Sequence, residues 1–279
     1  MNRLEFEAVV FTDLDGTLLD RNYDLDSSAY MLNELYQRGV LTVPASSKTE
    51  AELDAFKTLL EYDAPLISEN GAGIVWPVSL QPGLAPWVSS DAAPVDYGSI
   101  VKTLAGLRKK FGFKFSGFAD MTIDDVCEAT GLDRAAAQLA RQRVASEPID
   151  WADSPEHLAD FRAHLKTVGL TLTQGGQYFH VMSPVDKGQA ARRVLSVLTA
   201  EYQNEPRVIA CGDSQNDLPM LSMADACVVF PGTDGRYLDV GSMPRVCARA
   251  AGALPWLESV NQLIAQAIGG QVSSTKEGL

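Results

Sequence analysis

The chain has 279 residues, of which 46% are hydrophobic and 21% are charged, so it can bury a core and its composition does not indicate disorder. A formal net charge of −13 and a sequence pI near 4.6 argue against a nucleic acid or an anionic membrane surface as partner. Since the sequence has no signal-peptide pattern, no run near the ~20 apolar residues of a membrane span and no C-x-x-C pair among its four cysteines, we expect a cytoplasmic protein with free, mostly buried thiols.

The first predicted element is a buried parallel strand that ends in two carboxylates. The apolar run 9–12 stops at Asp13 and Asp15, and Gly16 allows a sharp turn just beyond them. Open α/β sheets bind ligands at the carboxyl ends of their strands. Two carboxylates this close repel each other unless a cation lies between them or one takes a proton. This strand end is therefore a candidate site for Mg²⁺ and for a carboxylate nucleophile, although an acidic turn would give the same short pattern.

Two strand–helix units make up the next stretch. The first helix is predicted to be capped by Asp26 or Ser27 and to end at Gly39. A strand over 40–45 leads into the polar residues 46–49, and a second helix follows with its apolar residues on one face. This alternation predicts a parallel sheet with right-handed crossovers.

The third strand, predicted over 65–68, ends in Glu69 and Asn70. Because Asn-Gly is a strong turn signal, residues 74–76 are predicted to return as a hairpin strand. Residues 79–94 contain three prolines and are predicted to be a connector outside the core.

Residues from about 95 to 183 do not continue the strand–helix alternation and are predicted to be an α+β insert. Its predicted elements are a helix around 100–107, a strand over 111–115, helices near 134–145 and 155–168, and a hairpin of 170–173 with 178–182. We place the domain boundaries accordingly. Residues 1–83 and 184–279 form a discontinuous core, and residues 84–183 form the inserted domain.

The strand–helix pattern resumes with a helix that begins near Lys187. A strand over 208–211 ends in the sequence G-D-S-Q-N-D, and a short helix over 218–223, a strand over 227–230 and a last helix ending at Gly269-Gly270 follow. The predicted fold class is α/β, a Rossmann-like doubly wound parallel sheet with an inserted α+β domain.

Polar side chains follow four of the predicted strands, where parallel strands bring them to one edge of the sheet. They are Asp13, Asp15, Ser46, Glu69, Asn70, Asp213, Asn216 and Asp217, and Lys187 lies at a helix start nearby. Taken singly, Ser46 is typical of a helix cap, Lys187 of a solvated lysine, and G-D-x-x-N-D of a turn or a calcium-like loop. The ordered set favours one site for phosphoryl transfer, which depends on positioning and charge stabilisation.

Each residue type suggests a role. Asp13 can attack phosphorus in line and form an aspartyl-phosphate, while Asp15 can protonate the leaving alkoxide and then activate water. Ser46 and the N–H groups at the start of its helix can bind phosphate oxygens, and Lys187 can neutralise charge. The predicted Mg²⁺ ligands are the Asp13 and Asp213 carboxylates and the Asp15 carbonyl; Asp217 either touches the metal or, with Asn216, orients Lys187 and the metal's waters.

The ordered motifs resemble the haloacid dehalogenase superfamily of phosphatases and mutases. D-L-D-G-T, Ser46, Lys187 and G-D-S-Q-N-D occur in the family's order, and the insert lies where the type IIB (Cof-like) subgroup carries its α/β cap domain. More narrowly, the strings F-T-D-L-D-G-T-L-L-D, S-S-K-T-E-A-E, I-S-E-N-G-A, F-G-F-K-F, G-G-Q-Y-F-H-V and G-D-S-Q-N-D-L-P-M-L resemble the mannosyl-3-phosphoglycerate phosphatases. The resemblance implies Mg²⁺-dependent release of phosphate from mannosyl-3-phosphoglycerate, through an aspartyl-phosphate, to give the compatible solute mannosylglycerate.

The resemblance also implies contacts to a small anionic sugar phosphate. Candidate contacts are Ser46, Ser47, Lys48, Glu69, Asn70, Gln177, His180 and Asn216. The family carries an arginine in the cap hairpin where this chain has Gln177, and glutamine keeps hydrogen bonding but lacks the bidentate cation. His157 and His164 are expected to be surface residues.

Alternatives remain beside this hypothesis. They are a glucosyl-3-phosphoglycerate or other sugar-phosphate phosphatase, a phosphomannomutase-like enzyme with the same cap type, and a non-catalytic binding protein on the same fold. The narrow resemblance favours hydrolysis. The intact set of Asp13, Asp15, Lys187 and Asp213 argues against a binding protein, and no oligomeric state is predicted.

Overall fold

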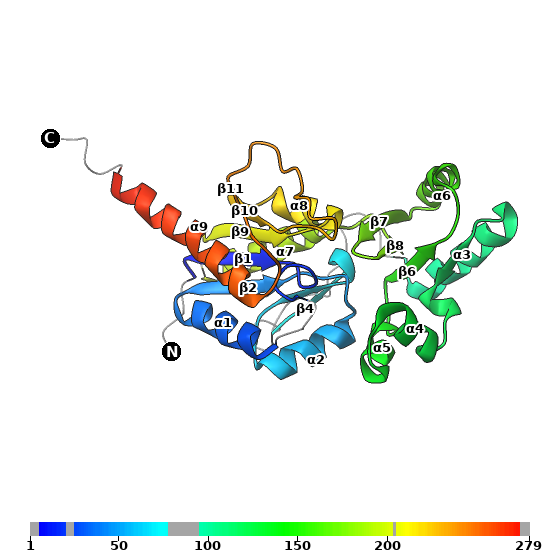
Figure 1. Cartoon of the computed structure of the whole chain (residues 1–279), viewed down its shortest axis with the longest axis horizontal. Helices are drawn as coiled ribbons and strands as arrows, with labels where there is room; N and C mark the ends of the chain where they lie inside the picture. The colour runs from blue at the N-terminus through cyan, green and yellow to red at the C-terminus, as the bar shows by residue number, and fades with distance from the viewer. Residues whose placement is uncertain (1–5, 21–24, 78–94, 203–204, 274–279) are drawn as a thin grey trace.

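A five-stranded parallel sheet forms the core of the computed structural model, which describes residues 6–20, 25–77, 95–202 and 205–273 (Figure 1). Its strands are β1 (Ala8–Thr12), β2 (Val40–Pro44), β9 (Arg207–Gly212), β10 (Ala226–Val229) and β11 (Arg245–Cys247). The order β11-β10-β9-β1-β2 reverses direction at β1, which is the topological switch point where such sheets bind ligands. A hairpin of β3 (Leu66–Ser68) and β4 (Gly73–Val75) continues beyond β2 through a parallel bridge between Ala45 and Ile67.

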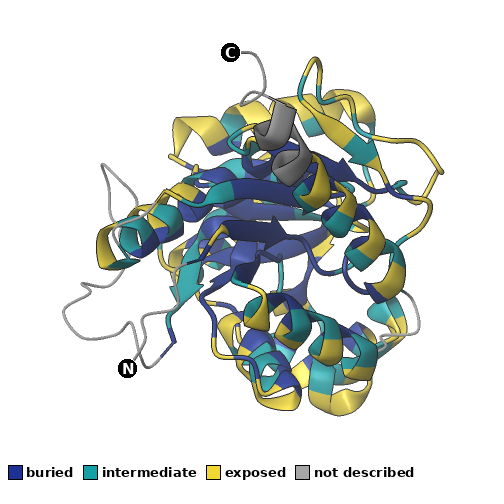
Figure 2. Ribbon diagram, turned by 90° about the vertical axis from the view of Figure 1, so that its left-hand side faces the viewer, coloured by how far each residue is buried: buried dark blue, intermediate teal, exposed yellow. Residues whose placement is uncertain are grey.

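Helices cover both faces of this sheet, and Figure 2 shows its strands as the most buried part of the molecule. The core helices are α1 (Leu25–Gln37), α2 (Glu50–Leu60), α7 (Lys187–Tyr202), α8 (Leu218–Leu221) and α9 (Ala253–Ser273). All five residues of β1 are buried, which explains its continuous apolar run. Trp256 of α9 is fully buried and donates from Nε1 to the Thr12 hydroxyl at 2.9 Å. This bond fixes the end of β1 just before Asp13.

The inserted domain has its own antiparallel sheet and lies to one side of the core (Figure 1). Its elements are α3 (Tyr97–Phe111), β5 (Phe115–Gly117), α4 (Ile123–Thr130), α5 (Arg134–Ala140), β6 (Ser146–Trp151), α6 (Pro155–Thr167), β7 (Thr171–Gly175) and β8 (Tyr178–Met182). The strand order is β5-β6-β8-β7, and aromatic rings from Phe113, Phe115, Trp151 and Phe161 pack beside it. The doubly wound parallel sheet and the α+β insert confirm the predicted fold class.

Several predicted elements in the insert are wrong in their bounds. Residues 111–115 do not form the predicted strand, because Phe111 ends α3 and Gly112 takes the left-handed conformation of a helix cap. The alternating phenylalanines mimic a strand pattern there. The helix predicted over 134–145 ends at Ala140, and β6 was not predicted because Pro148 lies inside it. Helix α4 was also missed.

The core shows three smaller corrections. Helix α1 begins at Leu25, so Asp26 and Ser27 lie inside its first turn and do not cap it. Helix α9 continues through Gly269 and Gly270 to Ser273, since a glycine in a helix costs only about 1 kcal/mol. The strand β11 was not predicted.

Other predictions about the chain have mixed outcomes. The connector predicted over 79–94 and the domain boundary at 83 and 84 lie outside the described residues, so the boundaries stay a prediction. All four cysteines are free, but only Cys211 and Cys227 are buried, and Cys247 is exposed. Across the described ranges, no helix combines the length and the apolar character that crossing a membrane requires.

Candidate active site

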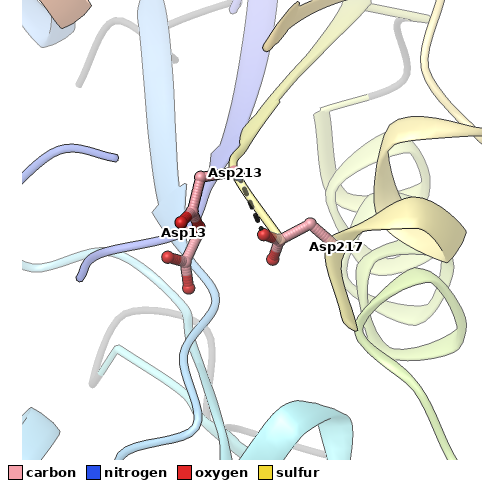
Figure 3. Close-up of side chains that lie close together, drawn as sticks. All are labelled: Asp13, Asp213 and Asp217. Atoms are coloured by element: carbon pink, nitrogen blue, oxygen red, sulfur yellow. Dashed lines mark hydrogen bonds between the residues drawn. The ribbon is translucent and has the colours of Figure 1, made fainter. Parts of the chain in front are cut away.

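Three carboxylates meet where β1 and β9 end (Figure 3). Asp13 follows β1, Asp213 follows β9, and Asp217 lies in the short 3-10 turn Gln215–Asp217. The backbone N–H of Asp13 donates to the carbonyl of Cys211 at 2.9 Å, which extends the pairing of the two strands to the site. Side-chain oxygens of the three aspartates lie within 4.8 Å of one another.

Lys187 joins this cluster from the first residue of α7. Its side chain is fully buried, and Nζ donates to Asp13 Oδ1 at 2.5 Å and to Asp217 Oδ1 at 2.7 Å. Burial alone would lower the pKa of Lys187, but the two carboxylates outweigh it and raise the pKa above its usual value. Lys187 therefore stays protonated and holds one oxygen of Asp13 in place.

Asp217 uses both of its oxygens on protein donors. While Oδ1 accepts from Lys187, Oδ2 accepts from the backbone N–H groups of Asp213 and Ser214 at 3.1 and 3.0 Å. The dashed line in Figure 3 marks the bond to Asp213. This arrangement fixes Asp213 and Lys187 relative to each other.

The charges of the cluster fit a divalent cation. Burial raises the pKa of Asp13 well above its usual value, and burial together with the charge of Asp217 raises the pKa of Asp213 to about 7. Three ionised carboxylates and one ammonium group leave an excess of two negative charges, and carboxylate oxygens are the ligands that Mg²⁺ prefers. A Cβ atom at Gly16 would lie 2.8 Å from Asp213 Oδ2, so the glycine keeps this position open.

Asp15 and Lys48 form a second ion pair beside the cluster. Lys48 Nζ lies 2.9 Å from Asp15 Oδ2, and the Lys48 side chain is only 16% exposed. The carboxylate of Asp15 is not part of the three-aspartate cluster. It thus lies outside the cluster that could hold a cation, which is compatible with its predicted acid and base role.

Ser46 is buried near the end of β2, but it is not at a helix start. Helix α2 begins at Glu50 and is capped by Thr49, which forms a reciprocal capping box with Glu52. Ser46 Oγ accepts from the backbone N–H of Lys48 at 3.2 Å. Ser46 is therefore not the helix cap of the alternative interpretation, and helix α2 follows the polar residues 46–49 as predicted.

A cavity of about 250 Å³ opens in front of these groups. The core contributes Asp13, Asp15, Ser47, Lys48 and Asn216 to its wall, and the inserted domain contributes Arg143, Gln177 and His180. The hairpin β7–β8 comes so close to the core that a Cβ atom on Gly175 would lie 2.7 Å from Asn216 Nδ2. Five predicted core residues and two predicted hairpin residues thus share one cavity.

Three predicted substrate contacts, Ser46, Glu69 and Asn70, do not line this cavity. Glu69 is fully buried, and its carboxylate accepts from the backbone N–H groups of Val144 and Ala145 and from the Ser146 hydroxyl, so it ties the inserted domain to the core instead of contacting substrate. Asn70 is also buried and accepts from Asn216 Nδ2 at 2.9 Å. Asn70 therefore positions Asn216, which does line the cavity.

Arg143 is a charged residue of the cavity wall that the sequence did not reveal. Its Nη2 donates to the Ser47 carbonyl and to Ser146 Oγ, each at 2.8 Å. In the sequence, a lone arginine near the end of a predicted helix does not indicate that its side chain will line a cavity. The two cap-helix histidines are peripheral: His157 is exposed, and His164 is half-buried and stacks on Phe111.

His180 gives this site a measurable pH dependence of stability. Burial, Arg143 and Lys187 lower its pKa to about 3 from the ordinary 6.5, so the folded protein holds the ring neutral while the unfolded chain protonates it. Stability from this group is complete above pH 6.5 and falls below it. We expect the free energy of unfolding of the wild type to fall relative to that of His180→Gln by about 1.4 kcal/mol per pH unit between pH 6 and 4. Urea titrations at several pH values check this, and parallel curves for the two proteins would contradict it.

Comparisons with known proteins agree with this geometry. The family model of the haloacid dehalogenase-like hydrolases matches residues 10–91 and 144–230, which include Asp13, Asp15, Lys187 and Asp213. A glucosyl-3-phosphoglycerate/mannosyl-3-phosphoglycerate phosphatase of Methanococcoides burtonii is 34% identical over 237 residues, which cover 82% of this chain and 86% of the relative.

Solved structures share the fold across nearly the whole chain. A haloacid dehalogenase-like hydrolase from B. subtilis superimposes with a TM-score of 0.60 at 18% identity, covering 92% of this chain and 98% of its own. The sucrose-phosphatase of Synechocystis sp. PCC6803, solved with sucrose and phosphate, gives a TM-score of 0.58 at 14% identity and covers 94% and 98%. At these identities the likeness concerns the fold alone.

Proposed function

The chain belongs to the haloacid dehalogenase-like hydrolase family and is a phosphoric monoester hydrolase, and from this premise we propose that it is a Mg²⁺-dependent mannosyl-3-phosphoglycerate phosphatase. The family resemblance predicted from the ordered motifs is thereby confirmed. The similarity to the Methanococcoides burtonii phosphatase over most of both chains supports the substrate proposal. The name of that relative also includes glucosyl-3-phosphoglycerate, which we keep as the second candidate substrate. Hydrolysis would yield mannosylglycerate, a compatible solute, and we expect it to occur in the cytoplasm.

Asp13 is the proposed nucleophile. Because Lys187 holds Oδ1, the other oxygen attacks phosphorus, the bond from phosphorus to the ester oxygen breaks, and Asp15 gives a proton to the leaving alkoxide. Asp15 then takes a proton from water, whose oxygen attacks the phosphorus and releases the Asp13 carboxylate. Asp15 is 40% exposed and lines the cavity, so it can reach both the alkoxide and the water.

Asp13 and Asp213 are the residues that would hold Mg²⁺, with the carbonyl of Asp15. The ion would neutralise the phosphate and the developing charge on the transferring group. We assign Asp217 to positioning instead of metal binding, because both of its oxygens accept hydrogen bonds from the protein. Ser47 and Asn216 line the cavity where phosphate oxygens would lie.

A phosphate-release assay with several substrates tests this proposal. We expect kcat/KM for mannosyl- or glucosyl-3-phosphoglycerate to exceed that for mannose 6-phosphate by at least about 100-fold, a difference of about 3 kcal/mol. EDTA should stop release and Mg²⁺ should restore it. If only simple sugar phosphates turn over, the substrate assignment is wrong and the family assignment stands; full activity in EDTA would remove Asp213 from its proposed role.

A further inference from the structure

We propose that Arg143 determines specificity by binding a second anionic group of the substrate, a carboxylate that lies close to the phosphoester. The inference rests on the proposed function, because a glycosyl-3-phosphoglycerate carries its carboxylate on the same three-carbon acid as the phosphate. Neither the motifs nor the predicted contacts pointed to this residue. It lies between α5 and β6, on the core-facing side of the inserted domain.

The guanidinium group is held beside the polar loop after β2. Arg143 is 7% exposed, and its Nη2 is fixed by the Ser47 carbonyl and by Ser146 Oγ. Its Nε donates to the Ser146 carbonyl at 3.3 Å. Ser47 and Arg143 both line the cavity that contains Asp13. An anion bound by Arg143 would therefore lie near the phosphate, not at the far end of the substrate.

The donors of Arg143 are not exhausted by these contacts. Among the described residues, no hydrogen bond uses Nη1. Glu69 lies 3.6 Å from Nε, but its carboxylate also takes two backbone N–H groups and a hydroxyl, and it is fully buried outside the cavity wall. In this ion pair the Glu69 carboxylate therefore lies inside the protein, and the Arg143 guanidinium group lies at the cavity.

The other charged side chains of the cavity wall leave the binding of a substrate carboxylate to Arg143. In the described wall, Asp13, Asp15 and Glu52 are acidic, and Lys48 is the basic side chain besides Arg143. Lys48 is paired with Asp15, and Lys187 is sealed behind Asp13 and Asp217. A substrate carboxylate would meet repulsion from the aspartates unless a cation faced it, and guanidinium groups match carboxylates in two-point geometry.

The hairpin opposite supplies neutral groups. Gln177 lines the cavity without a charge, and its Nε2 donates to the Ala129 carbonyl at 3.4 Å. His180 lines the same wall, is 4% exposed and leaves Nδ1 without a hydrogen-bond partner in the described structure. Gln177 and His180 suit the hydroxyl groups of a glycosyl or glycerate unit. The hairpin therefore offers no cation to the substrate carboxylate, and Arg143, which lies outside the hairpin, supplies it.

Calorimetry on an inactive background tests the proposal without relying on turnover. The Asp13→Asn protein is titrated in Mg²⁺ with 3-phosphoglycerate and with glycerol 3-phosphate, which has a hydroxymethyl group in place of the carboxylate. We expect 3-phosphoglycerate to bind at least about tenfold more tightly. Adding Arg143→Gln should reduce the preference to less than about threefold, and Arg143→Lys should give an intermediate value because it keeps the charge and loses the fork.

Arg141→Gln is the matched control. Arg141 lies two residues earlier at the end of α5, is partly exposed and is outside the cavity wall, so the preference should survive its loss. Equal binding of the two ligands to the protein with Arg143 intact would overturn the proposal. This measurement does not depend on whether the Arg143→Gln variant folds. An equal loss for both ligands would show a structural role only. A retained preference together with no turnover of glycosyl-3-phosphoglycerates would reject the proposed function and leave the carboxylate site intact.

Discussion

Replacing Asp13 with asparagine is expected to lower kcat for phosphate release by at least about 10⁴-fold with Mg²⁺ present. The amide matches the carboxylate in size but cannot form the acyl phosphate, and it removes one negative charge from the proposed metal site. Of the three clustered aspartates, Asp13 is the one that lines the described cavity, so Asp213 and Asp217 are not placed to substitute for it. Steady-state phosphate release from the best substrate of the wild type measures the effect.

The fold should survive this change. Lys187 keeps its bond to Asp217 at 2.7 Å, and the backbone of residue 13 keeps its bond to Cys211. We expect a native circular dichroism spectrum. An Asp26→Asn variant on the exposed first turn of α1 serves as the matched control and should retain full activity. Turnover by Asp13→Asn within about tenfold of the wild type would reject the nucleophile assignment.

Lys187→Met is expected to lose both activity and stability. It removes the ammonium group that contacts two buried carboxylates, and breaking a buried pair by deleting one partner costs about 3–5 kcal/mol. Because Mg²⁺ would supply the missing positive charge in part, we expect the metal to raise the free energy of unfolding more in the variant than in the wild type. Urea unfolding with and without Mg²⁺ measures both effects.

Lys57→Met provides the comparison for Lys187→Met. Lys57 pairs with Asp63 near the surface, where such pairs contribute at most about 1 kcal/mol. A loss in Lys187→Met no larger than that in Lys57→Met would mean that the buried cluster does not need its ammonium group. An unchanged response to Mg²⁺ would separate Lys187 from the metal site.

The sequence predicted that Asp13 and Asp213 lie together, because both residues follow a local rule. Asp13 and Asp213 each come directly after an apolar strand, and parallel strands bring such positions together. Lys187 could be assigned only through its place in the ordered set, since a single lysine at a helix start is usually solvated and this one is fully buried.

The remaining errors concern groups whose partners are distant in the chain. Glu69 was predicted to contact substrate because it follows a strand, but its partners lie at 143–146 in the other domain. Arg143 was missed for the same reason. In the insert, Pro148 obscured the strand β6, where tertiary pairing with β8 outweighs local propensity. Spaced phenylalanines suggested a false strand where Phe111 ends α3.

The most direct test of the central claim is to trap the phosphoryl group on Asp13. A single-turnover reaction with substrate carrying radioactive phosphorus is quenched with acid before it is complete. The protein is then digested, and the labelled peptide is identified. We predict label on the peptide that contains residues 9–18, and its release by hydroxylamine, as expected for an acyl phosphate. Rapid phosphate release with no label on that peptide, or label on a different one, would contradict the account.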